Sequence, residues 1–396
     1  MIAAMGDVML TLVAVPVVAA TGYLALLTAL SGRRRTPAAD MTTRFDIIVP
    51  AHNEASGIAA TVASLFAMSY PADRMRILVV ADNCTDDTAA RAMAAGATVL
   101  ERRSTTEKGK GYALAFGYEA SLRDGVADAV VVVDADSSVS PNLLSAFSAR
   151  FVSGADAVQA EYGVRNARDS WRTRLMVIAL TMFHTVRSLG RERLGLSCGL
   201  RGNGMGFRSS LLRRVPPRAF SIVEDVEYGI ALGLAGTRVW YVPEAQVHGD
   251  MPASAAASRS QRERWERGRL ALIREHVPVL LRAARGRAGR LAVDLAADLL
   301  VPPLTTLAAL VVAGVVLALF VMQRGFADGL GVVPWLAAAG ALAVYVIRGA
   351  VLSGAGPRVV LDLMWAPIFA VWKLTLMFTP TRRAGEWVRT TRSDES

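Results

Sequence analysis

The sequence has few residues of the kinds that build disulfide frameworks or zinc sites. Its 396 residues include two cysteines and four histidines. Two cysteines form at most one disulfide, and the histidines lack the paired spacing of zinc ligands. We therefore set aside a disulfide-stapled secreted domain and a zinc enzyme. The histidines are interpreted as structural: His52, His184, His248 and His276.

Glycine fingerprints for nucleotide binding are also missing. Gly109-Lys110-Gly111 lacks the earlier glycine that a phosphate-binding loop requires, and no Ser or Thr follows the lysine. Residues 50–54, after the first predicted strand, contain no glycine at all. These absences exclude a Walker-type NTPase and a dinucleotide oxidoreductase.

Hydrophobic residues are abundant and segregated. They make up 53% of the chain, and the mean hydropathy is +0.35. An apolar run of about 20 residues is long enough to cross a bilayer as a helix. Three crossings are predicted: Val8–Leu30, Leu299–Met322 and Val332–Leu352. No basic region precedes the first run, which favours a retained anchor over a cleaved signal peptide.

Arginines cluster beside these runs. The net charge of +10 therefore favours anionic lipid over nucleic acid as a partner. The positive-inside rule places the N-terminus outside, with residues 36–295 and the basic tail in the cytoplasm. Val359–Phe378 is also apolar, but its crossing would carry Arg382 and Arg383 out of the cytoplasm. We expect that segment, like Pro278–Leu300, to lie at the membrane interface.

This pattern predicts an integral membrane protein, placed in a bacterial inner membrane, with five consecutive parts. They are an anchor (1–35), a cytoplasmic domain (36–257), interfacial helices (258–298), a transmembrane hairpin (299–352) and an interfacial or re-entrant helix with a basic tail (353–396).

Between the apolar runs, short β-rich segments alternate with helical patterns, which predicts a parallel sheet covered by helices. The expected strands are Phe45–Pro50, Met75–Ala81, Thr98–Glu101, Ala129–Val133 and Ala157–Glu161. The expected helices include Glu54–Met68, Thr85–Ala95, Lys110–Leu122, Pro141–Phe151 and Trp171–Leu189. Ligands of such sheets bind beyond the carboxyl ends of the strands.

Polar clusters follow three of these strands. They are Pro50 to Glu54, Asp82 to Asp87, and Asp134-Ala135-Asp136. Helix capping would explain the Asn, Asp and Thr residues taken singly. It does not explain two carboxylates two positions apart after a buried strand, which share a face and can hold one divalent cation. Mg²⁺ or Mn²⁺ bound by so few protein oxygens completes its shell with water and substrate phosphates.

Two later segments carry further candidate residues. Glu224 and Asp225 open a predicted helix, where the dipole alone favours carboxylates. Residues 261–269 place arginines and Trp265 on one helix, which suits phosphate pairing and ring stacking, or simply a basic membrane-surface helix. Gly202-Asn203-Gly204 permits close backbone approach and is interpreted as a loop facing the acceptor, with a plain surface turn as the alternative.

In this order, the motifs resemble those of membrane-embedded family 2 glycosyltransferases, which include cellulose, hyaluronan and chitin synthases and ceramide glucosyltransferases. The similarity covers roughly residues 44–290. The motifs that carry it are Pro50-Ala-His-Asn53-Glu54, Asp82, Asp134-Ala-Asp136, Glu224-Asp225 and Gln261-x-x-Arg264-Trp265. It implies a GT-A fold, a Rossmann-like mixed α/β sheet with helices on both faces, joined to transmembrane helices.

The resemblance also implies site roles. Asp225 would be the general base, and Asp134 and Asp136 would hold the metal. The nucleotide-sugar would contact Pro50, Asn53, Glu54, Asp82, Lys110, Asp134, Asp136, Gln261, Arg264 and Trp265. The acceptor would contact Gly202, Asn203, Gly204, Glu224 and Trp265. Asn83 departs from the family pattern, since many relatives have a second aspartate there, and so does Val223, where some polysaccharide synthases have Thr.

The resemblance therefore implies an inverting, Mg²⁺- or Mn²⁺-dependent transfer of sugar from a nucleotide donor, usually a UDP-sugar. We expect a lipid, lipid-linked or polysaccharide acceptor, and single addition ranks above processive synthesis because only three crossings are predicted. A catalytically inactive membrane scaffold is the alternative of another class.

Overall fold

The structure is a computed structural model that describes residues 2–32, 35–166, 171–249, 255–354, 356 and 359–365, with backbone only at 172, 255–267 and 359–360. These residues group into two compact units. One takes the described residues of Met1–Gly32, Ser170–Arg193 and Ala296–Gly385, and the other those of Arg33–Asp169 and Leu194–Leu295. We call them the membrane-helix unit and the sheet unit. Residues 171–193, inside the predicted domain 36–257, group with the apolar helices.

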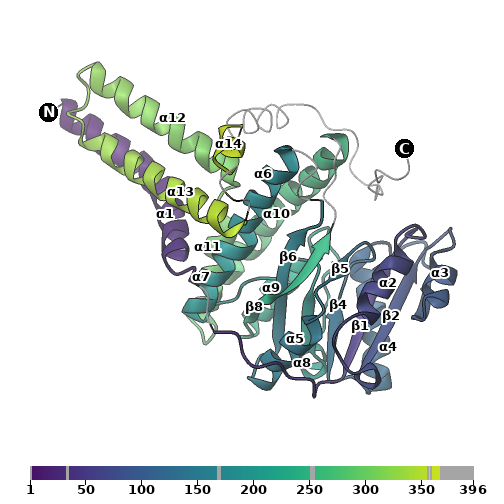
Figure 1. The fold of residues 1–396 in the computed structure, drawn as a ribbon. Helices are drawn as coiled ribbons and strands as arrows, with labels where there is room; N and C mark the ends of the chain where they lie inside the picture. Colours follow the sequence, from purple (N-terminus) through teal and green to yellow (C-terminus); the bar gives the residue numbers. More distant parts are fainter. Residues whose placement is uncertain are drawn as a thin grey trace. The chain divides into compact units, whose positions relative to one another are not determined.

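The sheet unit is built on a mixed sheet of eight strands in the order β3-β2-β1-β4-β7-β6-β8-β5 (Figure 1). Their bounds are β1 Phe45–Ala51, β2 Met75–Asp82, β3 Thr98–Arg102, β4 Ala129–Val132, β5 Ser138–Val139, β6 Ala157–Val164, β7 Met205–Arg208 and β8 Val239–Gly249. All five expected strands are present. The predicted parallel pairing holds for β3, β2, β1 and β4, and β7 inserts antiparallel between β4 and β6, so the sheet is mixed, as the family resemblance implies.

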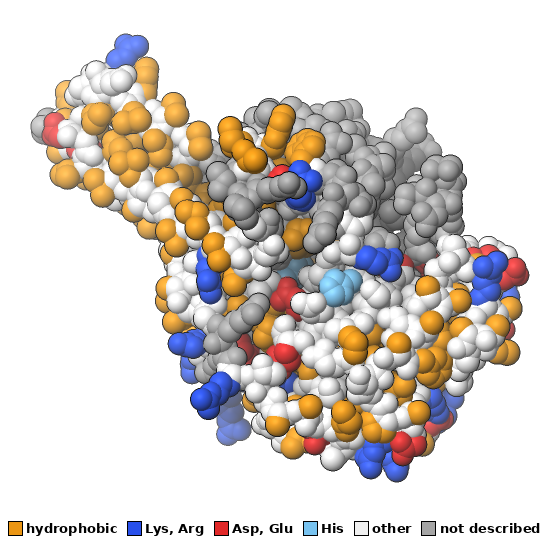
Figure 2. Space-filling model, viewed as in Figure 1, with side chains coloured by type: hydrophobic (Ala, Val, Ile, Leu, Met, Phe, Trp, Pro, Cys, Tyr) orange, Lys and Arg blue, Asp and Glu red, His pale blue; other side chains and the backbone are white. Residues whose placement is uncertain are grey.

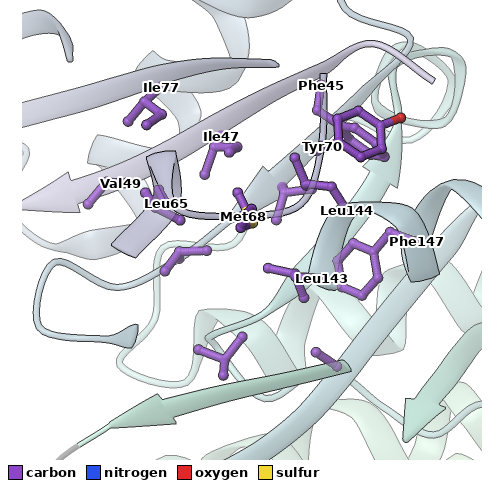
Figure 3. Packing of buried hydrophobic residues seen from close by; sticks show 14 of the residues in the cluster. Phe45, Ile47, Val49, Leu65, Met68, Tyr70, Ile77, Leu143, Leu144 and Phe147 are labelled. Atoms are coloured by element: carbon purple, nitrogen blue, oxygen red, sulfur yellow. The ribbon is translucent and has the colours of Figure 1, made fainter. Parts of the chain in front are cut away.

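Helices cover both faces of the sheet, as the side-chain period of two requires. Phe45, Ile47 and Val49 of β1 pack with residues of α2 and α5 in one buried cluster, shown in Figure 3. The alternate residue Ile48 faces α4, where a Cβ on Gly117 would lie 2.8 Å from its Cγ2. The nearly continuous Val and Ile runs are thus explained by burial on two faces.

The helices of this unit differ in detail from the expected ones. Their bounds are α2 Ile58–Phe66, η1 Ala72–Arg74, α3 Thr88–Ala94, α4 Lys110–Asp124, α5 Leu143–Val152, α8 Ser209–Arg214, α9 Glu224–Leu234, α10 Ala255–Ala283 and α11 Gly289–Leu300. The helix expected from Glu54 begins at Ile58, because residues 54–57 form a turn in which Gly57 N–H donates to the Glu54 carbonyl. Pro278–Leu300 is not one helix, since a turn at Gly286 separates α10 from α11.

The membrane-helix unit contains three helices long and apolar enough to cross a bilayer, as the sequence predicts. They are α1 Ile2–Ala29, α12 Leu304–Gln323 and α13 Val333–Leu352, the last preceded by η3 Leu330–Val332. Exposed apolar side chains face outward from these helices and form the hydrophobic surface that Figure 2 shows over them. Of Val359–Phe378, α14 covers Val359–Met364, and the segment beyond residue 365 lies outside the described residues.

The expected helix Trp171–Leu189 is interrupted by one π-helical stretch. It comprises α6 Trp171–Leu180, the π-helix η2 Thr181–Val186 and α7 Arg187–Leu194. The hydroxyl of Tyr345 donates to the Met182 carbonyl of η2 at 2.8 Å. This contact gives a carbonyl of the widened turn a partner from α13.

Buried ionic contacts join the segments of the membrane-helix unit. Arg187 and Arg191 both reach Asp298 Oδ1, at 3.0 and 2.6 Å. Near the N-terminal end of α1, the buried Asp7 carboxylate accepts hydrogen bonds from the backbone N–H groups of Asp328 and Gly331 at 3.1 and 2.7 Å. Asp7 thereby satisfies donors in the loop between α12 and α13.

Close packing of α12 on α13 gives a first testable prediction. A Cβ on Gly314 would lie 1.9 Å from Trp335 Cε3, so Gly314→Ala requires the indole to move. We expect a loss of about 1–3 kcal/mol, measured as a lower Tm in detergent. Gly340→Ala on α13 is the matched control, because no atom outside its own helix lies within 4 Å of that Cβ. Equal Tm values for the two variants would contradict the packing.

Candidate active site

The predicted polar clusters meet at one edge of the sheet. β1, β2 and β4 are neighbours and run parallel, so residues after their carboxyl ends lie side by side. Register pairs Ala51 with Ala81, and Val133 N–H donates to the Ile48 carbonyl. This edge carries the candidate site.

The loops after β1 and β2 are fastened to each other. Asn53 and Asn83 adopt positive φ angles of 55° and 51°, a region that Asn tolerates better than most residues. The side-chain Oδ1 of Asn53 accepts the Thr85 N–H at 2.8 Å, and His52 Nδ1 lies 2.7 Å from the backbone carbonyl of Asp82. Glu54 N–H donates to the Thr88 hydroxyl. Asn53, His52 and the Glu54 backbone therefore hold the loops after β1 and β2 together beside Asp82.

Asp82 is buried and already paired. Arg102 Nη1 lies 2.8 Å from its Oδ1, and Asn83 donates to the same oxygen at 3.1 Å. Arg102 also binds Glu107 at 2.7 Å, and its guanidinium lies 5.6 Å from the Tyr112 ring centroid. A nucleobase bound here would meet a carboxylate whose orientation Arg102 fixes.

The sequence reasoning missed Arg102, although a signal existed. β3 pairs with β2, and the register sets Asp82 directly opposite Arg102. Cross-strand opposite charges are a common pairing in sheets. The Tyr112 ring, stacked on Phe220 at 4.4 Å, was also not anticipated.

Lys110 lies at the centre of the second half of the site. Its ammonium binds Asp134 Oδ1 at 2.5 Å and the Gly202 carbonyl at 2.7 Å, and Glu224 Oε1 is 4.0 Å away. Burial alone would lower the pKa of Lys110, but the field of Asp134, Glu224 and Asp225 more than offsets it and the pKa is raised. Lys110 is therefore a fixed positive charge among carboxylates.

The loop containing Gly202, Asn203 and Gly204 supports the Asp134–Asp136 segment. The buried Asn203 side chain accepts the Asp134 N–H at 3.1 Å and donates to Ser137 Oγ at 2.7 Å. A Cβ on Gly204, whose φ is +65°, would lie 2.7 Å from Val247 Cγ2. Asn203 thus positions the aspartate loop, and its side chain has little surface left for an acceptor.

Glu224 and Asp225 begin α9, as the sequence predicts, and Val223 is its N-cap. Burial raises the pKa of Asp225, and it raises the pKa of Glu224 to about 7 despite the nearby Lys110. A Cβ on Gly202 would lie 3.4 Å from Asp225 Oδ2, so the glycine lets its backbone approach this carboxylate closely. The pair forms the polar end of a small pocket whose other walls are mostly apolar: Gly111, Leu114, Tyr118, Leu200, Met205, Pro217, Ala219 and Tyr228.

These pKa directions predict a pH dependence. A base must be ionised, so activity should rise with pH through the raised carboxylate pKa values. Glu224→Gln removes a negative charge beside Asp225, which lowers the Asp225 pKa and moves the acid limb of kcat/KM to lower pH. The measurement is a pH–rate profile, with Glu227→Gln of the same helix as control. An acid limb that stays in place in Glu224→Gln would rule out this coupling.

The predicted Gln261, Arg264 and Trp265 lie on the backbone of α10, so the helix expected there is confirmed. Their side chains lie outside the described residues. Three residues beyond Trp265, a Cβ on Gly268 would lie 2.8 Å from Val223 Cγ1. α10 therefore passes directly beside the residue that precedes Glu224.

The donor set suits a hard divalent cation held jointly with substrate. Among the described residues, no three His, Cys, Asp or Glu side chains form a complete metal site. Burial raises the pKa of Asp134, and the negative charge of Asp136 acts in the same direction, which places the two carboxylates within electrostatic reach of each other. The Lys110 ammonium already occupies a cation position on Asp134. Two carboxylates leave most of a coordination shell for phosphate oxygens and water.

Comparison with solved structures defines the class of fold. The chain superimposes on a mannosyltransferase from Pyrobaculum calidifontis, solved with GDP-Man and Mn²⁺, with a TM-score of 0.53 and 19% identity over 93% of this chain and 99% of that one. The mixed sheet of this chain, with helices on both faces, is that of the GT-A fold.

Residues 43–268 match the family model for glycosyltransferase like family 2, and the chain belongs to that family. It is 26% identical over 238 residues to a probable glycosyltransferase, YdaM, of Bacillus subtilis (strain 168), covering 57% of this chain and 55% of that protein. It is also 26% identical over 243 residues to a probable glucomannan 4-beta-mannosyltransferase 3 of Oryza sativa subsp. japonica, covering 57% of this chain and 43% of that protein. The chain thus spans about half the length of these relatives.

Proposed function

We propose that the protein is an inverting glycosyltransferase that moves a sugar from a nucleotide-sugar to a lipid, lipid-linked or polysaccharide acceptor at a membrane. The observation that carries the proposal is the cluster of Asp134, Glu224 and Asp225 around Lys110, at the strand edge of a family 2 domain. Four charged groups at the carboxyl ends of strands suit a reaction in which a diphosphate departs.

Asp225 is the proposed general base. Its carboxylate accepts the proton of the acceptor hydroxyl as that oxygen attacks the anomeric carbon. Attack from the face opposite the nucleotide breaks the bond to the diphosphate and inverts the configuration. The raised pKa of Asp225 makes it a better proton acceptor than an exposed aspartate.

Asp134 and Asp136 are the residues that would hold Mg²⁺ or Mn²⁺. When bound, such an ion neutralises charge on the leaving diphosphate. Asp82 and Arg102 would orient the base of the nucleotide. Gln261, Arg264 and Trp265 on α10 would face the diphosphate and the acceptor, and the Gly202–Gly204 backbone and Glu224 would line the acceptor side.

The donor we propose is a UDP-sugar, with GDP-mannose as the candidate suggested by the relatives. The complex of the archaeal neighbour contains GDP-Man, and several curated relatives are mannosyltransferases by name. The three candidate spans among the described residues favour addition to a lipid or lipid-linked acceptor, and processive polysaccharide synthesis is the alternative. The spans and flanking arginines support an inner-membrane protein with a cytoplasmic catalytic domain.

The deciding experiment incubates detergent-purified protein with Mn²⁺ and a panel of UDP- and GDP-sugars, and follows nucleotide release with candidate lipid acceptors. We expect acceptor-dependent release with one donor class. Absence of turnover with every donor, in protein that retains its thermal transition, would favour the inactive scaffold. Reporter fusions at the C-terminus test the orientation separately.

A further inference from the structure

The Asp134 carboxylate already binds a cationic group of the protein, the ammonium of Lys110. Lys110 Nζ lies 2.5 Å from Asp134 Oδ1, closer than to the Gly202 carbonyl or to Glu224 Oε1. A divalent ion binding the same carboxylate would lie beside this ammonium and be repelled by it. The two cations therefore compete for one carboxylate.

A second set of acceptors lies within reach of the Lys110 ammonium. The Gly202 carbonyl holds Nζ at 2.7 Å, and Glu224 Oε1 is only 4.0 Å away on the side of the acid pair. A Cβ at Gly202 would lie 3.6 Å from Nζ, and the glycine leaves that side open. The side chains of Lys110 and Asp134 are 25% and 32% exposed, so an ion can reach the carboxylate from solvent.

We propose that Lys110 is the resident counterion of the metal site: it occupies Asp134 in the metal-free protein and shifts toward Gly202 and Glu224 when a divalent cation binds. This inference rests on the proposed function, because it assigns Asp134 to metal binding. It predicts that the protein binds metal weakly alone. A nucleotide diphosphate, which brings its own negative charge, should then strengthen metal binding, and metal should strengthen nucleotide binding by the same factor.

The test measures Mn²⁺ binding directly, by the loss of the free-ion electron paramagnetic resonance signal, in full-length detergent-purified protein. Lys110→Met removes the competing ammonium, and we expect its Mn²⁺ Kd without nucleotide to be about tenfold lower than that of the wild type. Lys108→Met is the matched control, because Lys108 is exposed and its loss removes the same charge two residues away. Its Kd should stay near the wild-type value.

A second measurement guards against a purely structural role. Metal-free Lys110→Met should melt at a lower temperature, because it leaves the carboxylates of Asp134, Glu224 and Asp225 without their cation, and Mn²⁺ should raise its Tm more than that of the wild type. If Lys110→Met does not fold, Lys110→Gln keeps a donor for the Gly202 carbonyl and serves the same test. An unchanged or weaker Mn²⁺ affinity in the folded variant would overturn the inference.

The outcomes separate this inference from the proposed function. Donor turnover by the wild type with no gain in Mn²⁺ affinity in Lys110→Met would refute the counterion role alone. Tighter Mn²⁺ binding in Lys110→Met without turnover of any donor would refute the transferase assignment and leave the counterion role standing.

Discussion

Asp225→Asn should lower kcat for sugar transfer by about 10²–10⁴-fold, the usual contribution of a general base. The amide keeps the size of the carboxylate but cannot accept the proton of the acceptor hydroxyl. Donor binding should change little, because Asp225 is assigned to the acceptor side. The measurement is nucleotide release with acceptor present, together with nucleotide affinity by calorimetry.

Glu227→Gln is the matched control for Asp225→Asn. It removes a carboxylate from the same first turn of α9, where Glu227 only accepts a 3.3 Å hydrogen bond from Ser221 N–H. We expect this variant to retain most of its activity. Near-wild-type turnover by Asp225→Asn would show that another group, with Glu224 the neighbouring candidate, acts as the base.

Asp136→Asn should abolish most metal-dependent turnover, by about 10²-fold or more, a loss comparable to removing one electrostatic stabiliser of a developing charge. A neutral amide is a weaker ligand for Mg²⁺ or Mn²⁺ than a carboxylate. Raising the Mn²⁺ concentration should restore part of the activity, because the loss is one of metal affinity. The measurement is a Mn²⁺ titration of donor turnover.

Asp73→Asn is the control for Asp136→Asn, since Asp73 is an exposed aspartate of η1, outside the site. Its activity should match that of the wild type at every Mn²⁺ concentration. Full activity of Asp136→Asn at low Mn²⁺ would remove Asp136 from the metal site and would argue that Lys110 supplies the positive charge instead.

Local sequence patterns predicted the parts of the fold that depend on local chemistry. Ala129–Val133 is a continuous apolar run and Phe45–Pro50 is interrupted by Asp46 alone, so their composition predicts burial on two faces. The three long apolar helices follow from the length and hydropathy of their hydrophobic runs. The antiparallel insertion of β7 was not predictable in this way, because Met205–Arg208 is only four residues long and its place depends on long-range pairing with β4 and β6.

The site was predictable where chemistry follows a strand or opens a helix. Asp82, Asp134 and Glu224 occupy the positions that the pattern indicated. Partners brought by the fold were missed: Arg102 reaches Asp82 only through the β2–β3 register, and Asn203 reaches the aspartate loop across 69 positions of sequence. Such contacts depend on topology, which periodicity does not encode.

The bond from Asp7 to the loop between α12 and α13 has a consequence for how the chain is made. Asp7 and Gly331 are 324 residues apart in sequence. At about 5–20 residues per second, the ribosome needs roughly 15–65 s to deliver the loop after α1 has emerged. During that interval the Asp7 carboxylate lacks the two backbone N–H donors of the loop, so this contact between the first of the three long apolar helices and the loop before the last forms only after α12 has been made.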